Sequence, residues 1–597
     1  MRCSVRWYGR ACRRRWRRTS KPWNWLTKRS HWWSEVVELK DIVPVSEEST
    51  VFFKTGRWSP YKAAFEEKIS PCTEACPVGT DIPEVMWYVT QGLFDEALAL
   101  LLEENPLPGV CGRVCFHPCQ GACNRLDLDK GLKIREVERA VADLGKALPQ
   151  APVSFRDVKV AVVGSGPAGI SAAYFLRKLG YSVEVFERKG QAGGMLRFGI
   201  PEYRLPKAVL ERELQRLIPL GIRFNFEVSL DGQGIERLLG EYAAVVLSTG
   251  LWSPRRLGLK GEGLKGVYYG IHWLSEPPKL DQAPRSVVVI GGGDVAVDAA
   301  RVSRRRFPHA VVKIVAPEQE GEFPALPEGL SEAVEEEIEV IGGFKPLEFR
   351  GDDRLKGVVF ERVRVQKEEL SGQYLFIPVG GIMELEAELA IICAGQTFDK
   401  RSIPEGVLGE KGRPLVDRYG RTTLRGLYLA GDLTASRPTV VEALSSGKRV
   451  ALAIHAELLG EDPEVLFSEV RLGEGKGISF RGLNGKHKTL RKVARPKETA
   501  RLLVERVWDT PEPKRLPLGE RISTFLEVNL GMSESQAMEE AKRCLVCGKC
   551  VKCDLCFLCC PDLAVIKGER YRSDEDYCKG CGICVEVCPR NVWELEG

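Results

Sequence analysis

No stretch of about eighteen uninterrupted apolar residues occurs in the sequence, so no membrane-spanning helix is predicted. The N-terminal residues also lack the apolar segment that a secretory signal requires. The composition, 44% hydrophobic and 28% charged, is that of an ordinary globular protein. Because 597 residues are too many for a single hydrophobic core, we expect several domains.

Most of the chain carries no excess of positive charge, although its formal net charge is +5. Residues 1–34 hold eleven of the 87 Lys and Arg and none of the 82 acidic residues, which leaves 76 basic residues against 82 acidic ones elsewhere. A slightly acidic body predicts no nucleic-acid binding. Residues 1–59 form a basic, Trp-rich leader, which we interpret as a membrane-surface or partner-binding arm, a disordered tail or an over-long translation start.

Cysteine is nearly missing from the middle of the chain. Of the 20 cysteines, only Cys393 lies between residues 151 and 543, and most others stand in C-x2-C and C-x3-C-P runs near the two ends. Clustered thiols in a chain without an export signal indicate metal ligands in a reducing compartment rather than disulfides. We therefore predict a cytoplasmic protein.

The stretch VKVAVVGSGPAGISAAYFLRKLGYSVEVFER, residues 158–188, is typical of a strand, a glycine-rich turn, a helix and a second strand. Gly164 allows the tight turn, Gly166 lets the backbone approach a pyrophosphate, and Gly169 permits close packing of helix and strand. The phosphates would lie at the helix N-terminus, where free N–H groups attract anions. Glu187 at the end of the second strand is placed to accept from an adenosine ribose hydroxyl. This unit predicts a dinucleotide site.

A second fingerprint, SVVVIGGGDVAVDAARVSRR, has Gly291, Gly293 and Ala296 in the three glycine positions. Two such sites imply two dinucleotides, with hydride passing from a nicotinamide to a flavin. A disulfide reductase of this layout needs a redox-active cysteine pair beside the flavin. Since Cys393 has no partner in this region, thiol–disulfide exchange is not expected.

A later strand, GLYLAGD, ends at Gly431 and Asp432, and a helix is expected from near Thr439. An acid at such a strand end can bind the ribitol or pyrophosphate of a flavin, and the helix N-terminus can stabilise a reduced, anionic flavin. The same region is therefore predicted to complete the FAD site.

The order of these patterns predicts an α/β protein with two doubly wound dinucleotide-binding domains, one nested in the other. A helical iron–sulfur domain precedes them and a small α+β ferredoxin-like domain follows. The predicted ranges are 60–150 for the helical domain, 151–270 and 395–460 for the FAD domain, 271–394 for the NAD(P)H domain, 461–543 for a linker ending in a helix, and 544–597 for the ferredoxin domain.

The C-terminal cysteines follow the bacterial ferredoxin run C-x2-C-x2-C-x3-C-P twice, in which the fourth Cys of each run binds the other cluster. One [4Fe–4S] cluster is therefore assigned to Cys550, Cys553, Cys556 and Cys588. The second is assigned to Cys578, Cys581, Cys584 and Cys560. Zinc is the alternative metal, and Cys559 is out of register with both runs.

Several motifs resemble the small subunit of glutamate synthase and its relatives. They are GGMLRFGIPEYRLP (193–206), GGGDVAVD (291–298), TVVEALSSGK (439–448), CTEACPVGTDIP and NPLPGVCGRVCFHPCQGAC. The last two also resemble the N-terminal part of dihydropyrimidine dehydrogenase. Flavoproteins linked to sulfite or benzoyl-CoA reductases carry a similar ferredoxin domain. The resemblance implies FAD, NAD(P)H and iron–sulfur clusters, and the remaining cofactor-binding residues that we predict are Gly194, Met195, Thr249, Gly250, Asp294, Gly395 and Val440.

The nicotinamide domain departs from this resemblance at one point. NADPH-using relatives carry two arginines after its second strand, whereas Pro317 and Glu318 stand there in this chain. An acid at this strand end accepts from a free 2′-hydroxyl and repels a 2′-phosphate, so we predict NADH, with NADPH as the alternative. Arg304 to Arg306 could compensate, although a solvated helix end is the simpler interpretation.

The N-terminal cysteines are too few for the two clusters that the resemblance implies. By the family pattern, one cluster takes Cys76, Cys115, Cys119 and, as a non-cysteine ligand, Glu138. Cys72 and Cys123 are half of a second cluster. The segment EEAKRCLVCG resembles the missing piece, so we hypothesise that Cys544 and Cys547 fold back, or cross to a second subunit, and complete it. Four clusters use fifteen cysteines and leave five unused, which are Cys3, Cys12, Cys111, Cys393 and Cys559. Three clusters would leave Cys544 and Cys547 as packing residues.

These features predict an NAD(P)H-dependent flavoprotein that passes electrons through the clusters to or from ferredoxin or a partner redox enzyme. A glutamate synthase small subunit is the first alternative. A self-contained reductase is disfavoured, since no region remains for a second active site, and a non-enzymatic redox sensor is the third. The acceptor, and a homodimeric or hetero-oligomeric state, stay open.

Overall fold

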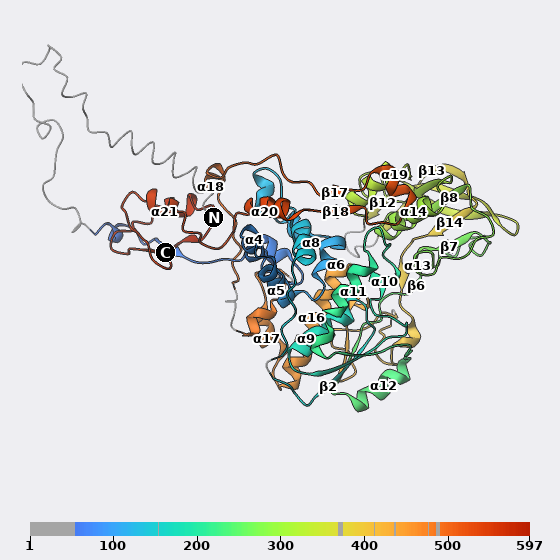
Figure 1. Cartoon of the computed structure of the whole chain (residues 1–597), viewed down its shortest axis with the longest axis horizontal. Helices are drawn as coiled ribbons and strands as arrows, with labels where there is room; N and C mark the ends of the chain where they lie inside the picture. The colour runs from blue at the N-terminus through green and yellow to red at the C-terminus, as the bar shows by residue number, and fades with distance from the viewer. Residues whose placement is uncertain are drawn as a thin grey trace, which may run out of the picture.

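The computed structural model describes residues 54–597 apart from 153, 368–373, 411, 435–437, 476 and 485–489. The predicted leader therefore lies outside the described residues as far as residue 53. Figure 1 shows a helical centre with the cysteine-rich C-terminal segment on one side and two α/β units on the others. No helix in the described part of the chain is both long and apolar enough to cross a membrane.

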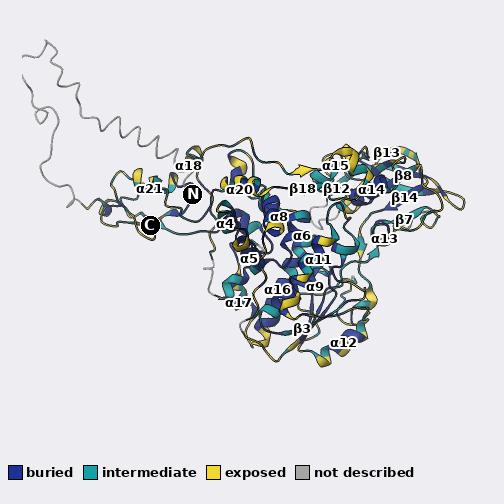
Figure 2. Ribbon diagram, in the orientation of Figure 1, coloured by how far each residue is buried: buried dark blue, intermediate teal, exposed yellow. Residues whose placement is uncertain are grey.

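The first α/β unit is built on a five-stranded parallel sheet in the order β16-β5-β2-β3-β4. Helix α9 packs against α16, and a Cβ atom added to Gly447 of α16 would lie 2.2 Å from the Ala168 carbonyl oxygen, so glycine permits the close crossing. Figure 2 shows both helices largely buried. The bounds are β2 Lys159–Val163, α9 Pro167–Lys178, β3 Ser182–Phe186, α10 Met195–Phe198, α11 Lys207–Gln215, β4 Arg223–Asn225, α12 Gly232–Glu241, β5 Ala244–Leu247, β16 Leu427–Leu429 and α16 Val440–Leu458.

The second α/β unit has its own parallel sheet, in the order β10-β9-β8-β14-β7. All its strands fall between β5 and β16 in sequence, which confirms the nested arrangement of two doubly wound sheets. An antiparallel meander, β11-β12-β13, extends from it. The bounds are β7 Val267–Tyr269, α13 Gly270–Ser275, β8 Ser286–Ile290, α14 Asp294–Arg306, β9 Val311–Val315, α15 Pro327–Glu335, β10 Glu339–Ile341, β11 Phe344–Gly351, β12 Leu355–Lys367, β13 Tyr374–Glu386 and β14 Leu389–Ile392.

The helical centre buries the apolar faces of short helices against one another. The apolar run at residues 83–108 forms two helices, α4 and α5, because Gly92 at φ 73° interrupts it. Helix α20 packs on α4 and α8 and begins at Ser533 with the capping box expected of SESQAMEEAKR. The bounds are α3 Pro71–Ala75, α4 Ile82–Thr90, α5 Phe94–Glu104, α6 Pro108–Val114, α7 Pro118–Gly121, α8 Ile134–Leu144 and α20 Glu534–Lys542. Three further helices lie elsewhere: α17, Pro463–Val470, packs on α16, α18, Glu498–Leu502, lies beside the C-terminal segment, and α19, Leu518–Ser523, packs on α14 (Figure 1).

The C-terminal segment shares a sheet with the start of the described chain. Strand β1, Lys62–Phe65, pairs antiparallel with β21, Trp593–Glu596, so that Lys62 faces Glu596. Between them lie the short helices α21, Leu555–Leu558, and α22, Ile583–Glu586, and the strands β19, Val565–Ile566, and β20, Arg572–Ser573. This pairing brings residues 62–65, from the range predicted as helical, next to the ferredoxin-like segment. The limits of the predicted domains stay a prediction.

Candidate cofactor and iron–sulfur sites

The first glycine-rich turn has the geometry that a pyrophosphate requires. Gly164 has φ +101°, a value that L side chains rarely adopt. A Cβ atom on Gly169 would lie 1.9 Å from the Gly164 carbonyl oxygen, so helix α9 packs on the turn after strand β2 as closely as glycine allows. A Cβ atom on Gly166 would meet nothing within 4 Å, so this position faces open space that a phosphate can fill.

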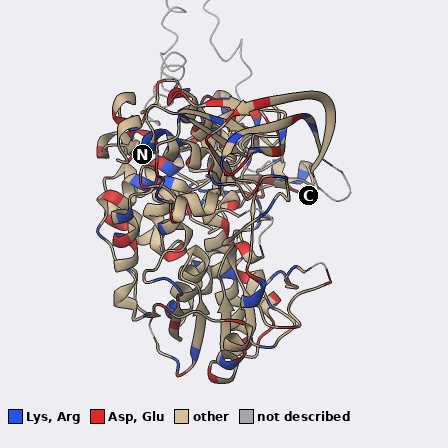
Figure 3. Cartoon of the chain, turned by 90° about the vertical axis from the view of Figure 1, so that its right-hand side faces the viewer, with Lys and Arg blue, Asp and Glu red and all other residues tan. Residues whose placement is uncertain are grey.

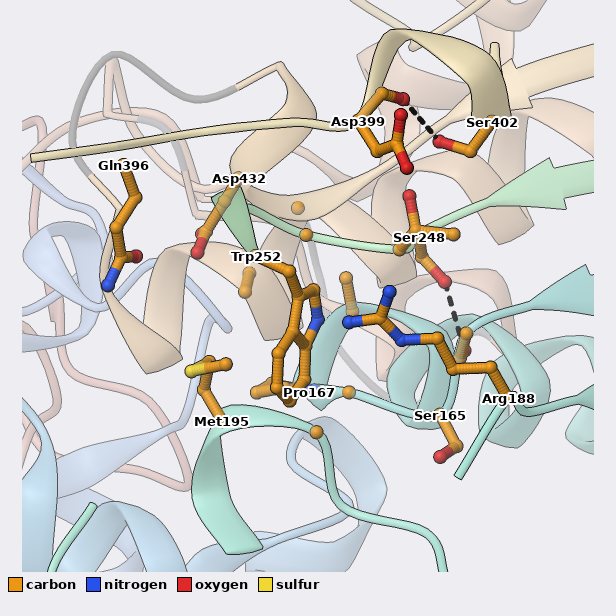
Figure 4. Close-up of a pocket in the computed structure, with 18 of the residues that line it drawn as sticks. Ser165, Pro167, Arg188, Met195, Ser248, Trp252, Gln396, Asp399, Ser402 and Asp432 are labelled. Atoms are coloured by element: carbon orange, nitrogen blue, oxygen red, sulfur yellow. Dashed lines mark hydrogen bonds between the residues drawn. The ribbon is translucent and has the colours of Figure 1, made fainter. Parts of the chain in front are cut away.

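A cavity of about 1290 Å³ opens in front of this turn. Figure 4 shows Met195, Trp252 and Asp432 around one space, with Ser165 and Pro167 of the turn beside it. The cavity is bordered mainly by the first α/β unit, and helix α14 of the second unit contributes Asp294, Val295 and Asp298. The predicted residues that line it are Gly164, Gly166, Glu187, Gly194, Met195, Thr249, Gly250, Asp294, Gly431, Asp432, Thr439 and Val440.

Glu187 is held by the turn that it is predicted to assist. Its Oε2 accepts from the Ser165 N–H at 2.9 Å and from Ser165 Oγ at 2.6 Å, and its Oε1 accepts from the Lys189 N–H at 2.9 Å. The side chain is 7% exposed. These donors fix the carboxylate at the rim of the cavity, where a free lone pair can still accept from a ribose hydroxyl.

Asp432 lies opposite, just after strand β16. Burial raises the pKa of its carboxyl to about 6. The helix that follows begins at Val440, and Thr439 caps it by accepting from the Glu442 N–H. The N-terminus of this helix and the Asp432 carboxyl thus border the same cavity. The free N–H groups of the helix favour anions, and the carboxyl can accept hydrogen bonds from hydroxyl groups.

Sequence reasoning missed several residues of this cavity, among them Arg188 and Trp252. The Arg188 guanidinium lies 4.6 Å from the centre of the Trp252 ring, a cation–π contact at the cavity edge. Figure 4 shows both side chains reaching into the space. The signals were weak, since Arg188 merely follows Glu187 and Trp252 follows the Thr249–Gly250 pair.

The second glycine-rich turn repeats the first. Gly291 has φ +134°, and a Cβ atom on Gly293 or Gly395 would meet nothing within 4 Å. Ala296 is fully buried in the helix packing, as its third position in the motif predicts. The Glu318 carboxylate lies over this turn, because a Cβ atom on Gly292 would be 2.7 Å from its Oε2. That oxygen is buried and has no hydrogen-bond partner within the described residues.

Arg304 to Arg306 do not form a solvated helix end, and the expectation that they do is wrong. Arg304 and Arg305 are buried, and Arg305 forms a two-pronged ion pair with Glu336 at 2.7 and 2.8 Å. Arg304 pairs with Glu337 at 2.7 Å, while Arg306 lies over Trp273 at 4.8 Å. The cause is α15 and the turn after it, which place acids against α14. These arginines are thus already engaged within the protein.

Four thiols of the helical centre gather around Glu138. Cys76, Cys111, Cys115, Cys119 and Glu138 line one small internal cavity. Burial, and next the charge of Glu138, raise the pKa of Cys115 to about 12. Glu138 accepts from Asn105 Nδ2 at 3.1 Å, and burial raises its pKa to about 8. The structure therefore brings together the predicted set and adds Cys111, which sequence reasoning left unused.

This thiol site adjoins the large cavity through one helix end. Val440 lines the cavity and Val441, the next residue of α16, lines the thiol site. Val114 and Phe116, on either side of Cys115, also reach the cavity. A cofactor in the cavity and a cluster at this site would thus be near neighbours.

Cys72 lies near three cysteines from elsewhere in the chain. Burial raises its pKa well above the usual value, and the nearby Cys123, Cys544 and Cys547 raise it further. Asn124 Nδ2 donates to Cys547 Sγ at 3.2 Å, and the Val546 N–H donates to Cys544 Sγ at 3.4 Å. The structure thus brings together, within one chain, the four thiols of the hypothesised second N-terminal cluster.

The C-terminal thiols gather in the crossed sets that the ferredoxin run predicts. Burial raises the pKa of Cys556 to about 12, with Cys588, Cys553 and Cys550 as the neighbouring thiols that add to it. The same holds for Cys584, whose pKa of about 12 is raised by burial and then by Cys578, Cys581 and Cys560. Among the described cysteines, only Cys581 is exposed to solvent, and the others are buried or half-buried.

The donor chemistry of these sites fits [4Fe–4S] clusters. Each C-terminal set and the set around Cys72 offer four thiols, and the set around Glu138 offers four thiols and a carboxyl. Each ligand of such a cluster binds a different iron, so the donors surround the cluster rather than meet at a point. In the described chain, no three His, Cys, Asp or Glu side chains are arranged to hold a single metal ion.

Comparison with known proteins gives three family matches. Residues 158–456 match pyridine nucleotide-disulphide oxidoreductase, residues 65–148 match dihydropyrimidine dehydrogenase domain II, 4Fe-4S cluster, and residues 571–594 match the 4Fe-4S binding domain. The first match covers about half of the chain and spans both α/β units.

Curated relatives match over most of the chain. It is 30% identical to the NADP(+)-dependent formate dehydrogenase subunit beta of Moorella thermoacetica, over 80% of this chain and 70% of that protein. It is 32% identical to the NAD-dependent dihydropyrimidine dehydrogenase subunit PreT of Salmonella typhimurium, over 65% of this chain and 90% of that protein. It is 31% identical to the glutamate synthase [NADPH] small chain of Bacillus subtilis, over 71% of this chain and 98% of that protein. The chain therefore belongs to the pyridine nucleotide-disulphide oxidoreductase family, among the iron–sulfur flavoproteins related to glutamate synthase small chains.

Proposed function

We propose that this NAD(P)H-dependent oxidoreductase transfers electrons from NADH through FAD and four [4Fe–4S] clusters to a partner redox protein. The observation that carries the proposal is the convergence of four thiol-rich sites, the first of which adjoins the large cavity. FAD exchanges two electrons with a nicotinamide and one at a time with a cluster, which is the chemistry that the bound groups would supply.

The residues of the cavity bind and orient the flavin. The Gly166 backbone and the α9 N-terminus receive the pyrophosphate, Glu187 holds a ribose, and Asp432 accepts from a flavin hydroxyl. The N-terminus of α16 at Thr439 favours negative charge on the ring. Helix α14 closes the cavity from the side of the second unit through Asp294 and Val295, so the nicotinamide reaches the flavin from there.

Adjacent thiol sites give an order to the electron path. The site around Cys76, Cys115, Cys119 and Glu138 adjoins the cavity, and Cys119 also has Cys72 of the next site among its neighbours. Cys544 and Cys547 of that next site precede Cys550 of the ferredoxin run by only a few residues. Electrons would leave at the cluster of Cys581, whose side chain is exposed.

NADH as the nucleotide is supported by Glu318. Its Oε2 is buried beside Gly292 with no donor in the described chain, so a ribose 2′-hydroxyl can satisfy it and a 2′-phosphate would be repelled. Arg304 and Arg305 are paired with Glu337 and Glu336, which removes the expected source of compensation. The relatives bear names with NAD as well as NADP, so kinship alone does not decide the nucleotide.

A glutamate synthase small subunit is the second candidate, because the chain spans 98% of the Bacillus small chain. The match to a further 4Fe-4S binding domain at residues 571–594 favours an electron carrier instead. The partner is proposed as ferredoxin or a dedicated redox subunit, and the many thiols fit a reducing compartment such as the cytoplasm.

Reduction of the purified protein by NADH tests the function. We expect flavin bleaching followed by cluster reduction, and steady reduction of methyl viologen or ferredoxin without other subunits. A Glu187→Ala variant should lose FAD affinity, while Glu227→Ala on the neighbouring loop should not. Inactivity toward every acceptor, joined to glutamate formation with an added amidotransferase subunit, would establish the second candidate.

A further inference from the structure

Arg590 connects the second N-terminal thiol site to one of the two C-terminal thiol sites. Arg590 follows Cys588-Pro589, and its carbonyl oxygen accepts from the Gly548 N–H at 2.8 Å. Gly548 itself follows Cys547, so one backbone hydrogen bond joins a ligand loop of one site to a ligand loop of the other. The neighbouring Asn591 is anchored by Lys68 Nζ, which donates to its Oδ1 at 3.1 Å.

The Arg590 side chain begins between the two ligand loops, since its residue is hydrogen-bonded to Gly548 of one loop and comes two residues after Cys588 of the other. It lowers the pKa of Cys544, Cys547 and Cys588, although burial remains the larger effect and raises all three. Its Nε is buried and has no hydrogen-bond partner within the described residues. A guanidinium stays protonated in proteins, so this is a permanent charge.

Three other cations of this region are paired with carboxylates. Lys68 pairs with Glu594 at 2.8 Å, and Lys549 pairs with Asp81 at 2.7 Å. Arg543 pairs with Glu540 at 2.7 Å. No ion pair of Arg590 with a carboxylate occurs among the residues that the structure describes. Its charge can therefore act on iron–sulfur clusters bound by the neighbouring thiols.

We propose that Arg590 is a positioning residue that raises the reduction potentials of the two neighbouring clusters, one on Cys72, Cys123, Cys544 and Cys547 and one on Cys550, Cys553, Cys556 and Cys588. This inference rests on the proposed function. Each cluster on four thiolates is anionic, and an added electron makes it more so, which disfavours reduction of both neighbours at once. A fixed cation between them offsets that repulsion. The step it assists moves one electron from one centre to the next, with one centre oxidised, the other reduced, and no proton transferred.

Redox titration followed by EPR tests this in Arg590→Gln, Arg590→Lys and the control Arg570→Gln. Arg570 lies in the same segment, 62% exposed and 3.8 Å from Glu67. With iron content unchanged, Arg590→Gln should lower two of the four midpoint potentials by about 59 mV each. For a one-electron step this is about a tenfold change in the equilibrium constant of reduction. Arg590→Lys should keep most of the wild-type values, and Arg570→Gln all of them.

The outcomes separate this inference from the function on which it rests. Four centres with unshifted potentials in Arg590→Gln would overturn the role of Arg590 alone. An equal shift in Arg590→Lys would also overturn it, since the charge is then not the cause. Only three centres in the wild-type protein would overturn the proposed cluster number and this inference together.

Discussion

Asn124 donates a hydrogen bond to Cys547 Sγ at 3.2 Å, across 423 residues of sequence. Asn124 directly follows Cys123, so this contact holds the C-terminal thiol beside an N-terminal one. The two ends of the chain thus meet at one site, and the fold joins what the sequence separates.

The first prediction concerns iron content. The wild-type protein should hold about sixteen irons per chain, four per cluster, and Cys544→Ser/Cys547→Ser about twelve. Cys393→Ser is the matched control, since Cys393 lies in the second α/β unit and belongs to none of the thiol sites, and it should keep the full content. About twelve irons in the wild type, unchanged in the double variant, would show that only three clusters form.

The second prediction separates Glu138 from Cys111 as the fourth ligand near the flavin. Asn105 donates to the Glu138 carboxylate and also hydrogen-bonds Cys111 of helix α6, so this side chain does not distinguish the two. The family pattern places the non-cysteine ligand at Glu138. We expect Glu138→Ala to change the EPR signal of one cluster and to make that cluster less stable in air. Cys111→Ala should leave the signal and the iron content as they are. Loss of about four irons in Cys111→Ala alone would assign the ligand to the thiol.

What could be predicted from the sequence was local or carried by a motif. The turn at Gly164 is predictable because strand, turn and helix follow one another within about thirty residues. The pairing of β1 with β21 was not, since both strands are four residues long and more than 500 residues apart. The arginines of α14 were misjudged for a similar reason, because Glu336 comes from a later turn. Contacts between residues far apart in sequence leave no local hydrophobic pattern from which they could be predicted.

The third prediction concerns nucleotide preference. Removal of the Glu318 carboxylate in Glu318→Ala takes away both a ribose acceptor and a charge that repels a phosphate. The ratio of kcat/KM for NADH to that for NADPH should fall about tenfold or more, as expected for one hydrogen bond to a charged group. Glu320→Ala in the same loop is the control and should leave the ratio unchanged. A wild-type preference for NADPH would contradict the assignment.

The fourth prediction concerns pH. Burial raises the pKa of Asp432 to about 6, so the folded protein without FAD binds this proton more tightly than the unfolded chain. Its contribution to stability is complete at low pH, below the ordinary carboxyl range, and is lost as the pH rises through about 6. Relative to Asp432→Asn, the FAD-free wild type should lose up to about 3 kcal/mol over this window. Urea unfolding at each pH from 4 to 7 measures the free energy of unfolding of both proteins. A constant difference between the wild type and Asp432→Asn over this range would exclude the effect.

The last prediction concerns a buried ion pair that joins three parts of the fold. Lys448 of α16 donates to Glu104 of α5 at 2.5 Å and to the Val78 carbonyl oxygen at 2.6 Å, and both side chains are almost completely buried. Glu104 also accepts from Ser479 Oγ and from the Phe480 N–H. Lys448→Met would leave this carboxylate buried without its cation, at a cost of about 3–5 kcal/mol.

The double variant Glu104→Gln/Lys448→Met decides whether the charge or the packing matters. It removes both charges together and keeps one amide oxygen that can still accept a hydrogen bond, so it should be less destabilised than the sum of the single variants. Thermal unfolding followed by far-ultraviolet circular dichroism measures each change. Lys260→Met, at an exposed pair with Glu348 separated by 3.4 Å, is the control and should shift stability by less than about 1 kcal/mol. Additive losses in the double variant would mean that the pair contributes no coupling, and that α5 and α16 are held by apolar contacts alone.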